Sequence, residues 1–238
     1  MNISIQKAAD RGAADYGWLK ARYYFSFSNY HNPQKIHFGA LRVLNDDIIA
    51  GGGGFPTHPH NNMEIVTIPF SGAIAHRDNT GGSGTIKAGD VQIMSAGSGV
   101  HHSEKNASET VASNLFQLWV FPKVKNIKPR YDQRTFNVQD RLNKWQVVVS
   151  PEEKDKALWI NQDAVFSLTK LETGNSLTYE NAFKGNGVYL VVINGSVIVN
   201  ETVLEKRDAA GITGTDSFTI TANAEAELLA VEVPMNMH

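Results

Sequence analysis

The sequence contains no cysteine, which excludes a disulfide framework and thiolate metal ligands. Its charge is nearly balanced, with 22 Lys and Arg against 24 Asp and Glu, unlike the basic footprint of a nucleic-acid-binding protein. No apolar run approaches the roughly 18 residues of a membrane-spanning helix. The first twenty residues interrupt their apolar positions with charges, so they lack the apolar core of a secretory signal. These absences predict a cytoplasmic protein without a membrane or direct nucleic-acid partner.

Long helical periodicity is also missing. Short segments rich in Val, Ile, Thr and Phe alternate with Gly, Asn, Asp or Pro, among them "EIVTIPF", "DVQIM", "NLFQLWVF", "VFSLTKL", "VYLVVI", "SVIVN" and "ELLAVEV". Strands at this regular spacing are typical of an all-β sandwich or barrel. Residues 151–162 permit one short helix.

An internal repeat indicates two related halves. Residues 65–78, "IVTIPFSGAIAHRD", resemble residues 189–201, "YLVVINGSVIVNE", with Gly72 matching Gly195. A little further on, Asp90 matches Asp208. The repeat predicts two β-barrels in tandem.

The histidines are distributed unevenly between these halves. Seven of the eight lie in the first 102 residues, and the eighth is the last residue of the sequence. A histidine-based metal site is therefore expected only in the first barrel. The second barrel is interpreted as a copy without metal ligands.

The segment "THPHNNMEIVTIPF" (57–70) places two histidines one residue apart. Residues i and i+2 of a strand point to the same face, so His58 and His60 can direct two imidazoles at one point. If no bulge intervenes, the same alternation turns Glu64 inward together with the apolar Val66 and Ile68. This pattern predicts that His58 and His60 are metal ligands, with Glu64 beside them.

The second histidine segment, "GVHHSEKN" (99–106), follows the same rule. His102 and Glu104 share one face, whereas His101 shares the other with Lys105, which would repel a cation. A single His-x-His occurs often on surfaces, but two such segments favour a metal site. Three imidazoles and a carboxylate suit Fe(II), Mn, Ni, Cu or Zn, and leave coordination positions open for catalysis. His76 is interpreted as a surface residue and Trp119 as core packing.

The motifs also resemble those of a known family. "THPHNNME" is similar to the first cupin motif and "GDVQIMSAGSGVHHSEKN" to the second. Together with "FSFSNYHNP", "LRVLNDD" and "QLWVFP", they resemble the pirin family, and in particular bacterial pirin-like quercetin 2,3-dioxygenases. The resemblance implies a bicupin of two double-stranded β-helix, jelly-roll-like barrels. We expect a metal-binding domain at 1–135 and a cupin domain without metal ligands at 136–238.

The family's ligand pattern falls on His58, His60, His102 and Glu104, the set that the alternation selects. Many other cupins use the glutamate of the first motif, so Glu64 remains the rival ligand, base or pocket-wall residue. The resemblance implies Fe(II), with Mn, Ni, Cu, Zn or Co as alternatives. It also implies opening of a flavonol heterocycle by dioxygen with release of carbon monoxide, with Glu104 or Glu64 taking the hydroxyl proton. Two alternatives are a metal-dependent regulator acting through a protein partner, and a cupin isomerase or hydrolase. A monomer is expected.

Overall fold

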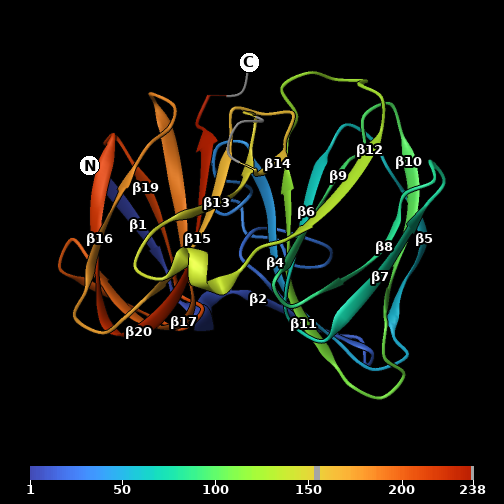
Figure 1. The fold of residues 1–238 in the computed structure, drawn as a ribbon, viewed down its shortest axis with the longest axis horizontal. Coiled ribbons are helices and arrows are strands. Elements are labelled where there is room, and N and C mark those ends of the chain that lie inside the picture. The colour runs from blue at the N-terminus through green and yellow to red at the C-terminus, as the bar shows by residue number, and fades with distance from the viewer. Residues whose placement is uncertain (153–155, 237–238) are drawn as a thin grey trace.

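The chain folds into two β-barrels that lie side by side (Figure 1). The computed structural model describes residues 1–152 and 156–236. Within these residues the helical segments are two short 3₁₀ helices, Ala8–Asp10 and Val138–Arg141. Part of the expected helix at 151–162 lies outside the described residues, and Leu158–Trp159 form strand β14 instead. The prediction of an all-β fold is confirmed.

The N-terminal barrel consists of a seven-stranded and a four-stranded sheet. The larger sheet has the order β12-β9-β6-β11-β4-β3-β2. Its strands are β2 (Gly12–Asp15), β3 (Leu19–Tyr23), β4 (Leu41–Ile49), β6 (Glu64–Ser71), β9 (Asp90–Ser95), β11 (Ser113–Val120) and β12 (Arg130–Thr135). The smaller sheet has the order β5-β10-β7-β8. Its strands are β5 (Gly54–His60), β7 (Ala73–Asp78), β8 (Ser83–Lys87) and β10 (Val100–Asn106).

The C-terminal barrel is built around one strongly bent sheet with the path β1-β19-β17-β20-β15-β13-β14, to which β16 and β18 add. Its strands are β1 (Asn2–Gln6), β13 (Gln146–Ser150), β14 (Leu158–Trp159), β15 (Val165–Leu171), β16 (Ser176–Glu180), β17 (Asn186–Val199), β18 (Thr202–Glu205), β19 (Ala209–Thr213) and β20 (Ser217–Pro234). The expected strands at 188–193 and 196–200 therefore form one long strand, β17, with register shifts near Asn194.

The first strand of the chain belongs to the C-terminal sheet. β1 pairs antiparallel with β19, and in Figure 1 it lies in dark blue among the orange and red strands. The first strand of the expected N-terminal domain thus crosses to the other barrel. The division between residues 135 and 136 otherwise stays a prediction, and β12 ends at Thr135.

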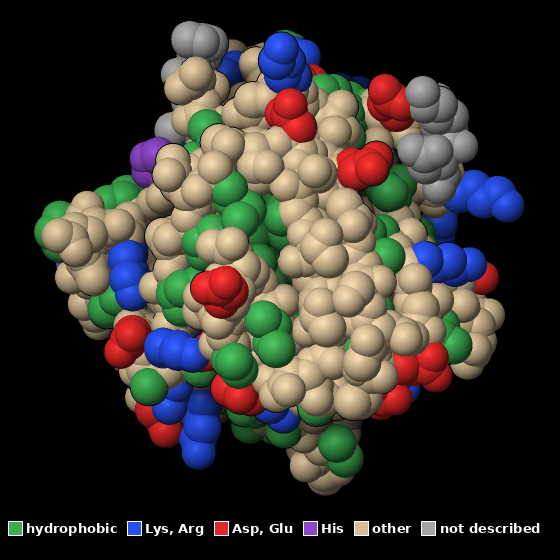
Figure 2. Space-filling view, turned by 90° about the vertical axis from the view of Figure 1, so that its left-hand side faces the viewer, with side chains coloured by type: hydrophobic (Ala, Val, Ile, Leu, Met, Phe, Trp, Pro, Cys, Tyr) green, Lys and Arg blue, Asp and Glu red, His purple; other side chains and the backbone are tan. Residues whose placement is uncertain are grey.

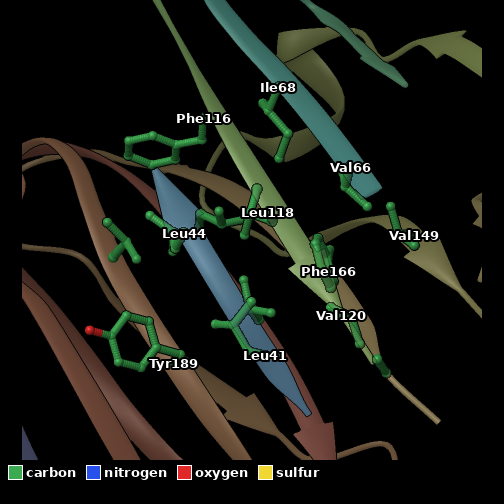
Figure 3. Close-up of a cluster of buried hydrophobic side chains, with 14 of the residues drawn as sticks. Leu41, Leu44, Val66, Ile68, Phe116, Leu118, Val120, Val149, Phe166 and Tyr189 are labelled. Atoms are coloured by element: carbon green, nitrogen blue, oxygen red, sulfur yellow. The ribbon is translucent and has the colours of Figure 1, made fainter. Parts of the chain in front are cut away.

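The two barrels share a continuous hydrophobic core. Strands β4, β6 and β11 turn one face away from their own barrel, toward β13, β15 and β17 (Figure 3). This face carries Leu44, Val66 and Phe116, which are fully buried with Phe166 of the C-terminal half. Burying one such side chain contributes about 1.5–3 kcal/mol. The contact fixes which residues of β4, β6 and β11 point into the N-terminal barrel.

This packing corrects the expected alternation across residues 58–70. The segment is two strands in different sheets, β5 and β6, separated by a turn in which Asn62 has a φ of 48°. Val66 therefore faces the second barrel, and Glu64 points the same way. The alternation within β5 holds, but it does not continue through the turn.

The internal repeat is visible in the backbone at matching positions. Gly72 separates β6 from β7 with a φ of 70°, and Gly195 lies in β17 with a φ of 80°, conformations that glycine adopts readily. Asp90 accepts a hydrogen bond from the Lys87 backbone N–H at 3.1 Å, and Asp208 accepts one from the Glu205 N–H at 3.0 Å. Matching backbone conformations and hydrogen bonds at these positions support a duplicated barrel.

The outer surface of the C-terminal half has mixed charge. Figure 2 shows acidic and basic side chains interspersed on this face, with apolar side chains between them. Among the described residues, no helix has the length and apolar character needed to cross a membrane.

Candidate metal centre

Three histidines from β5 and β10 meet in the N-terminal barrel. His58 and His60 extend from β5, and the antiparallel register places His102 of β10 directly opposite His58. The ring centroids of His58 and His102 are 4.4 Å apart, and His60 lies 4.8 Å from each. One ring nitrogen from each residue lies within 4.8 Å of the other two. The structure thus brings together the three histidines that the sequence predicts.

The hydrogen bonds of these histidines leave nitrogen lone pairs available. The Nδ1 of His58 lies 2.8 Å from the Pro56 carbonyl, which can only accept, so Nδ1 carries the proton and Nε2 is free. The Nε2 of His102 is buried and has no hydrogen-bond partner among the described residues. Burial lowers the pKa of His60 to about 4 and of His102 to about 3, so both rings are neutral at pH 7. Neutral imidazoles with an unpaired nitrogen fit a divalent transition metal.

A fourth histidine, His76, lies behind His102. Its exposed fraction is 1%, so its interpretation as a surface residue is wrong. On β7 it shares a face with the buried Ile74, a signal that the sequence alone contained. Its ring stacks on Tyr131, and its Nδ1 lies 3.4 Å from the Nδ1 of His102. Its Nε2 lies 3.1 Å from Asp78 Oδ2.

These contacts define a chain of proton positions. Hydrogen bonds lower the pKa of Asp78 against the opposing effect of burial, so its carboxylate accepts from the His76 Nε2–H. The Nδ1 of His76 must then accept from the Nδ1–H of His102. That arrangement leaves the Nε2 of His102 unprotonated, as a metal ligand requires. A carboxylate behind a ligating histidine commonly fixes the ring in this way.

Replacing Asp78 by asparagine is therefore expected to weaken metal binding by about 10- to 100-fold. The asparagine amide would donate to His76 Nε2. His76 Nδ1 would then donate to His102 Nδ1, which places the proton of His102 on its Nε2. Calorimetric titration of the metal-free protein measures the affinity. Asp132→Asn, a more exposed carboxylate on β12, is the control and should keep wild-type affinity. Wild-type affinity in Asp78→Asn would contradict the assigned proton positions.

Glu104 lies on the same face of β10 as His102. It is 3% exposed, and it forms a second group of potential ligand atoms with His76 and His102, also within 4.8 Å. Gln117 Nε2 donates to its Oε2 at 2.7 Å, and Thr67 Oγ1 donates to its Oε1 at 3.5 Å. Desolvation raises the pKa of Glu104 to about 7, although both hydrogen bonds act in the opposite direction. An adjacent cation would favour its ionised form.

The neighbouring His101 and the rival carboxylate Glu64 lie elsewhere. His101 is exposed, as the alternation along β10 predicts. Glu64 is fully buried at the contact between the barrels, where its Oε2 accepts from Ser95 Oγ at 2.7 Å and from the Asn161 backbone N–H at 3.2 Å. Among the described residues, Glu64 belongs to neither group of ligand atoms.

A cavity of about 180 Å³ adjoins the histidines. Its rim is half-buried and partly aromatic, and includes Trp119, whose ring packs edge-on against His60 at 4.8 Å. Trp119 is therefore a cavity wall rather than only core packing. The floor is buried and polar. It includes Asn45 and Asp47, which the sequence did not single out as site residues. The lining consists of Leu19, Ala21, Tyr23, Phe27, Asn45, Asp47, Phe55, His58, His60, Glu104, Gln117 and Trp119.

Comparison with known proteins supports a single family along the chain. Residues 5–120 match the Pirin family and residues 147–233 match the quercetinase C-terminal cupin domain. Quercetin 2,3-dioxygenase of Escherichia coli K12 is 38% identical over 98% of this chain and 99% of its own. A pirin-like protein of Caulobacter vibrioides is 45% identical over 93% of this chain and 95% of its own.

Solved structures agree with the sequence relatives. The crystal structure of YhhW from Escherichia coli covers 100% of both chains with a TM-score of 0.94 and 37% identity. The complex of YhhW with nickel(II) has a TM-score of 0.92 over 98% of this chain and 99% of that one. The predictions of a bicupin fold and of the family are confirmed by these matches, and the chain belongs to the pirin family.

Proposed function

We propose that the protein is a metal-dependent dioxygenase that opens the heterocycle of a flavonol such as quercetin. The observation that carries the proposal is the cavity beside the three histidines, whose aromatic walls suit a flat polycyclic molecule. Relatives named quercetin 2,3-dioxygenase align along almost the whole chain. The reaction balances as one flavonol and one dioxygen giving one depside and one carbon monoxide.

We infer that His58, His60, His102 and Glu104 hold a single divalent metal. Three imidazoles and one carboxylate suit Fe(II), and equally permit Mn, Ni, Cu, Zn or Co, because availability and geometry select among these ions. When bound, the metal supplies Lewis-acid polarisation that lowers the pKa of a coordinated flavonol hydroxyl.

The protein's own contribution follows from the placement of its side chains. Of the two cupin-motif glutamates, Glu104 lines the cavity and Glu64 does not, which supports Glu104 as the carboxylate that takes the proton of the flavonol hydroxyl. Gln117 holds Glu104 in place through its 2.7 Å hydrogen bond. Trp119, Phe55 and Phe27 form the apolar walls that orient the rings and exclude water.

The two alternative functions make less use of this geometry. A regulator acting through a protein partner needs no cavity beside its metal, and a cupin isomerase or hydrolase needs no dioxygen. The cavity favours an enzyme over a regulator, and the requirement for dioxygen separates an oxygenase from the other enzymes.

The proposed activity is tested by incubating quercetin with protein reconstituted separately with each candidate metal. Under dioxygen, we expect carbon monoxide and the depside to form in equal amounts, with neither formed under nitrogen. Carbon monoxide is measured in the headspace and the depside by mass spectrometry. Metal-loaded protein that leaves quercetin unchanged with every ion would contradict the proposal.

A further inference from the structure

The motif "LRVLNDD" (41–47) supplies polar residues to two different faces of β4. Leu44 lies in the core between the barrels, and the neighbouring Asp46 contacts Arg11 on that same side. Asn45 and Asp47 alternate with them and line the cavity beside the histidines. Two polar side chains from one strand thus reach the floor of a cavity whose walls are mainly apolar.

Both side chains lack a protein partner where burial would normally require one. Asn45 is 3% and Asp47 is 2% exposed. The Oδ1 atoms of Asn45 and Asp47 are buried and form no hydrogen bond within the described part of the chain. Buried polar atoms are nearly always paired, because leaving one unpaired destabilises the fold. Unpaired acceptors that line a cavity indicate a ligand that carries hydrogen-bond donors.

The surroundings define the chemistry of that ligand. Burial, followed by the nearby Asp46 and Glu104, raises the pKa of Asp47 to about 8, which favours its neutral carboxyl. A neutral carboxyl both donates and accepts, as a hydroxyl does. Tyr23 and Phe27 line the same cavity and suit the flat face of a ring. A neutral hydroxylated aromatic ring meets all of these requirements.

We propose that Asn45 and Asp47 form a hydroxyl-recognition subsite that binds ring hydroxyls of the aromatic substrate, away from the hydroxyl that reaches the metal. The subsite rests on the proposed function in that it assigns a polyhydroxylated aromatic substrate to the same cavity. It predicts that the protein discriminates among flavonols by their ring hydroxyls. A site built to hydrogen-bond a hydroxyl rejects the analogue that lacks it, because its polar groups are then left unpaired.

The test compares binding of quercetin and of 3-hydroxyflavone, which keeps the hydroxyl at position 3 but has no other. Affinities are measured by fluorescence quenching of the metal-loaded protein under nitrogen, so that no turnover is needed. We expect the wild type to bind quercetin at least about tenfold more tightly, as one hydrogen bond implies. In Asn45→Ala and in Asp47→Ala, the ratio of the two dissociation constants should fall toward 1.

The control is Gln146→Ala in the C-terminal barrel, which also removes a buried side-chain oxygen without a partner and should keep the wild-type ratio. Thermal melting and metal content establish that each variant is folded and loaded. If Asp47→Ala does not fold, Asp47→Asn, which keeps the shape and one acceptor, should retain part of the discrimination while Asn45→Ala loses it.

Equal affinity of the wild type for the two flavonols, or an unchanged ratio in both alanine variants, would overturn the subsite. The result is independent of catalysis. Discrimination without carbon monoxide formation would support the subsite and reject the proposed reaction. Carbon monoxide formation without discrimination would support the proposed reaction and reject the subsite.

Discussion

Replacing His102 by alanine is expected to abolish tight metal binding and, with it, flavonol cleavage. His102 faces both His58 and His60, and its Nε2 is the buried nitrogen left without a partner. Its loss removes one of the three imidazoles that form the site. Metal affinity should fall by more than about 100-fold, beyond the effect of altering a residue that only supports a ligand.

The adjacent histidine provides a matched control for this prediction. His101→Ala changes the same residue type one position earlier, but His101 is exposed on the opposite face of β10. It should retain wild-type metal affinity and turnover. Equal losses in the two variants, or tight metal binding by His102→Ala, would contradict the assignment. Titration calorimetry and metal content after dialysis measure metal binding by both variants.

Replacing Arg207 by alanine should give the largest loss of stability, about 3–5 kcal/mol in the free energy of unfolding. Arg207 of the C-terminal barrel reaches into the N-terminal one, where its Nε lies 3.1 Å from Asp46 Oδ2 and its Nη2 donates to Asn114 Oδ1 at 2.9 Å. Its guanidinium also lies over the rings of Phe70 and Phe116. Truncation leaves the buried Asp46 carboxylate with Arg11 as its one remaining cationic partner, beside the neutral amide of Asn114, and leaves Asn114 Oδ1 without its donor.

An exposed ion pair between the halves is the control for Arg207. Lys123 and Asp163 lie 2.7 Å apart with side chains 58% and 38% exposed. Exposed pairs contribute about 0–1 kcal/mol, so Lys123→Ala should change stability little. Urea unfolding measures both variants. A loss in Arg207→Ala no greater than that in Lys123→Ala would show that the buried cluster does not hold the barrels together.

The clustering of His58, His60 and His102 could be predicted from the sequence because each pair of candidates lies within one strand. Alternation along β10 separates His102 from His101 correctly, and alternation along β5 puts His58 and His60 on one face. The tandem barrels were visible through the paired glycines and aspartates. These features depend on local geometry, which the order of residues encodes directly.

The predictions from sequence fail where the chain passes from one sheet to another, or where two strands far apart in sequence meet. Glu64 was placed beside the histidines because the turn at Asn62, which moves the chain from β5 to β6, leaves little trace in the spacing of apolar residues. His76 was interpreted as a surface residue although it shares a face of β7 with Ile74, and the pairing of β7 with β10 sets it opposite Glu104. Asn45 and Asp47 looked like part of a motif without a role, since only the closed barrel brings β4 to the cavity floor.

Metal titration of Glu104→Gln beside Glu64→Gln tests the central claim most directly, since the two substitutions remove one carboxylate charge each from the two cupin motifs. With one metal held by His58, His60, His102 and Glu104, Glu104→Gln should bind metal at least about tenfold more weakly, as expected when a charged ligand becomes neutral. Glu64→Gln should keep wild-type affinity and one metal per chain, because Glu64 contacts Ser95 and Asn161 instead. Undiminished binding in Glu104→Gln together with weakened binding in Glu64→Gln would contradict the site proposed for this protein.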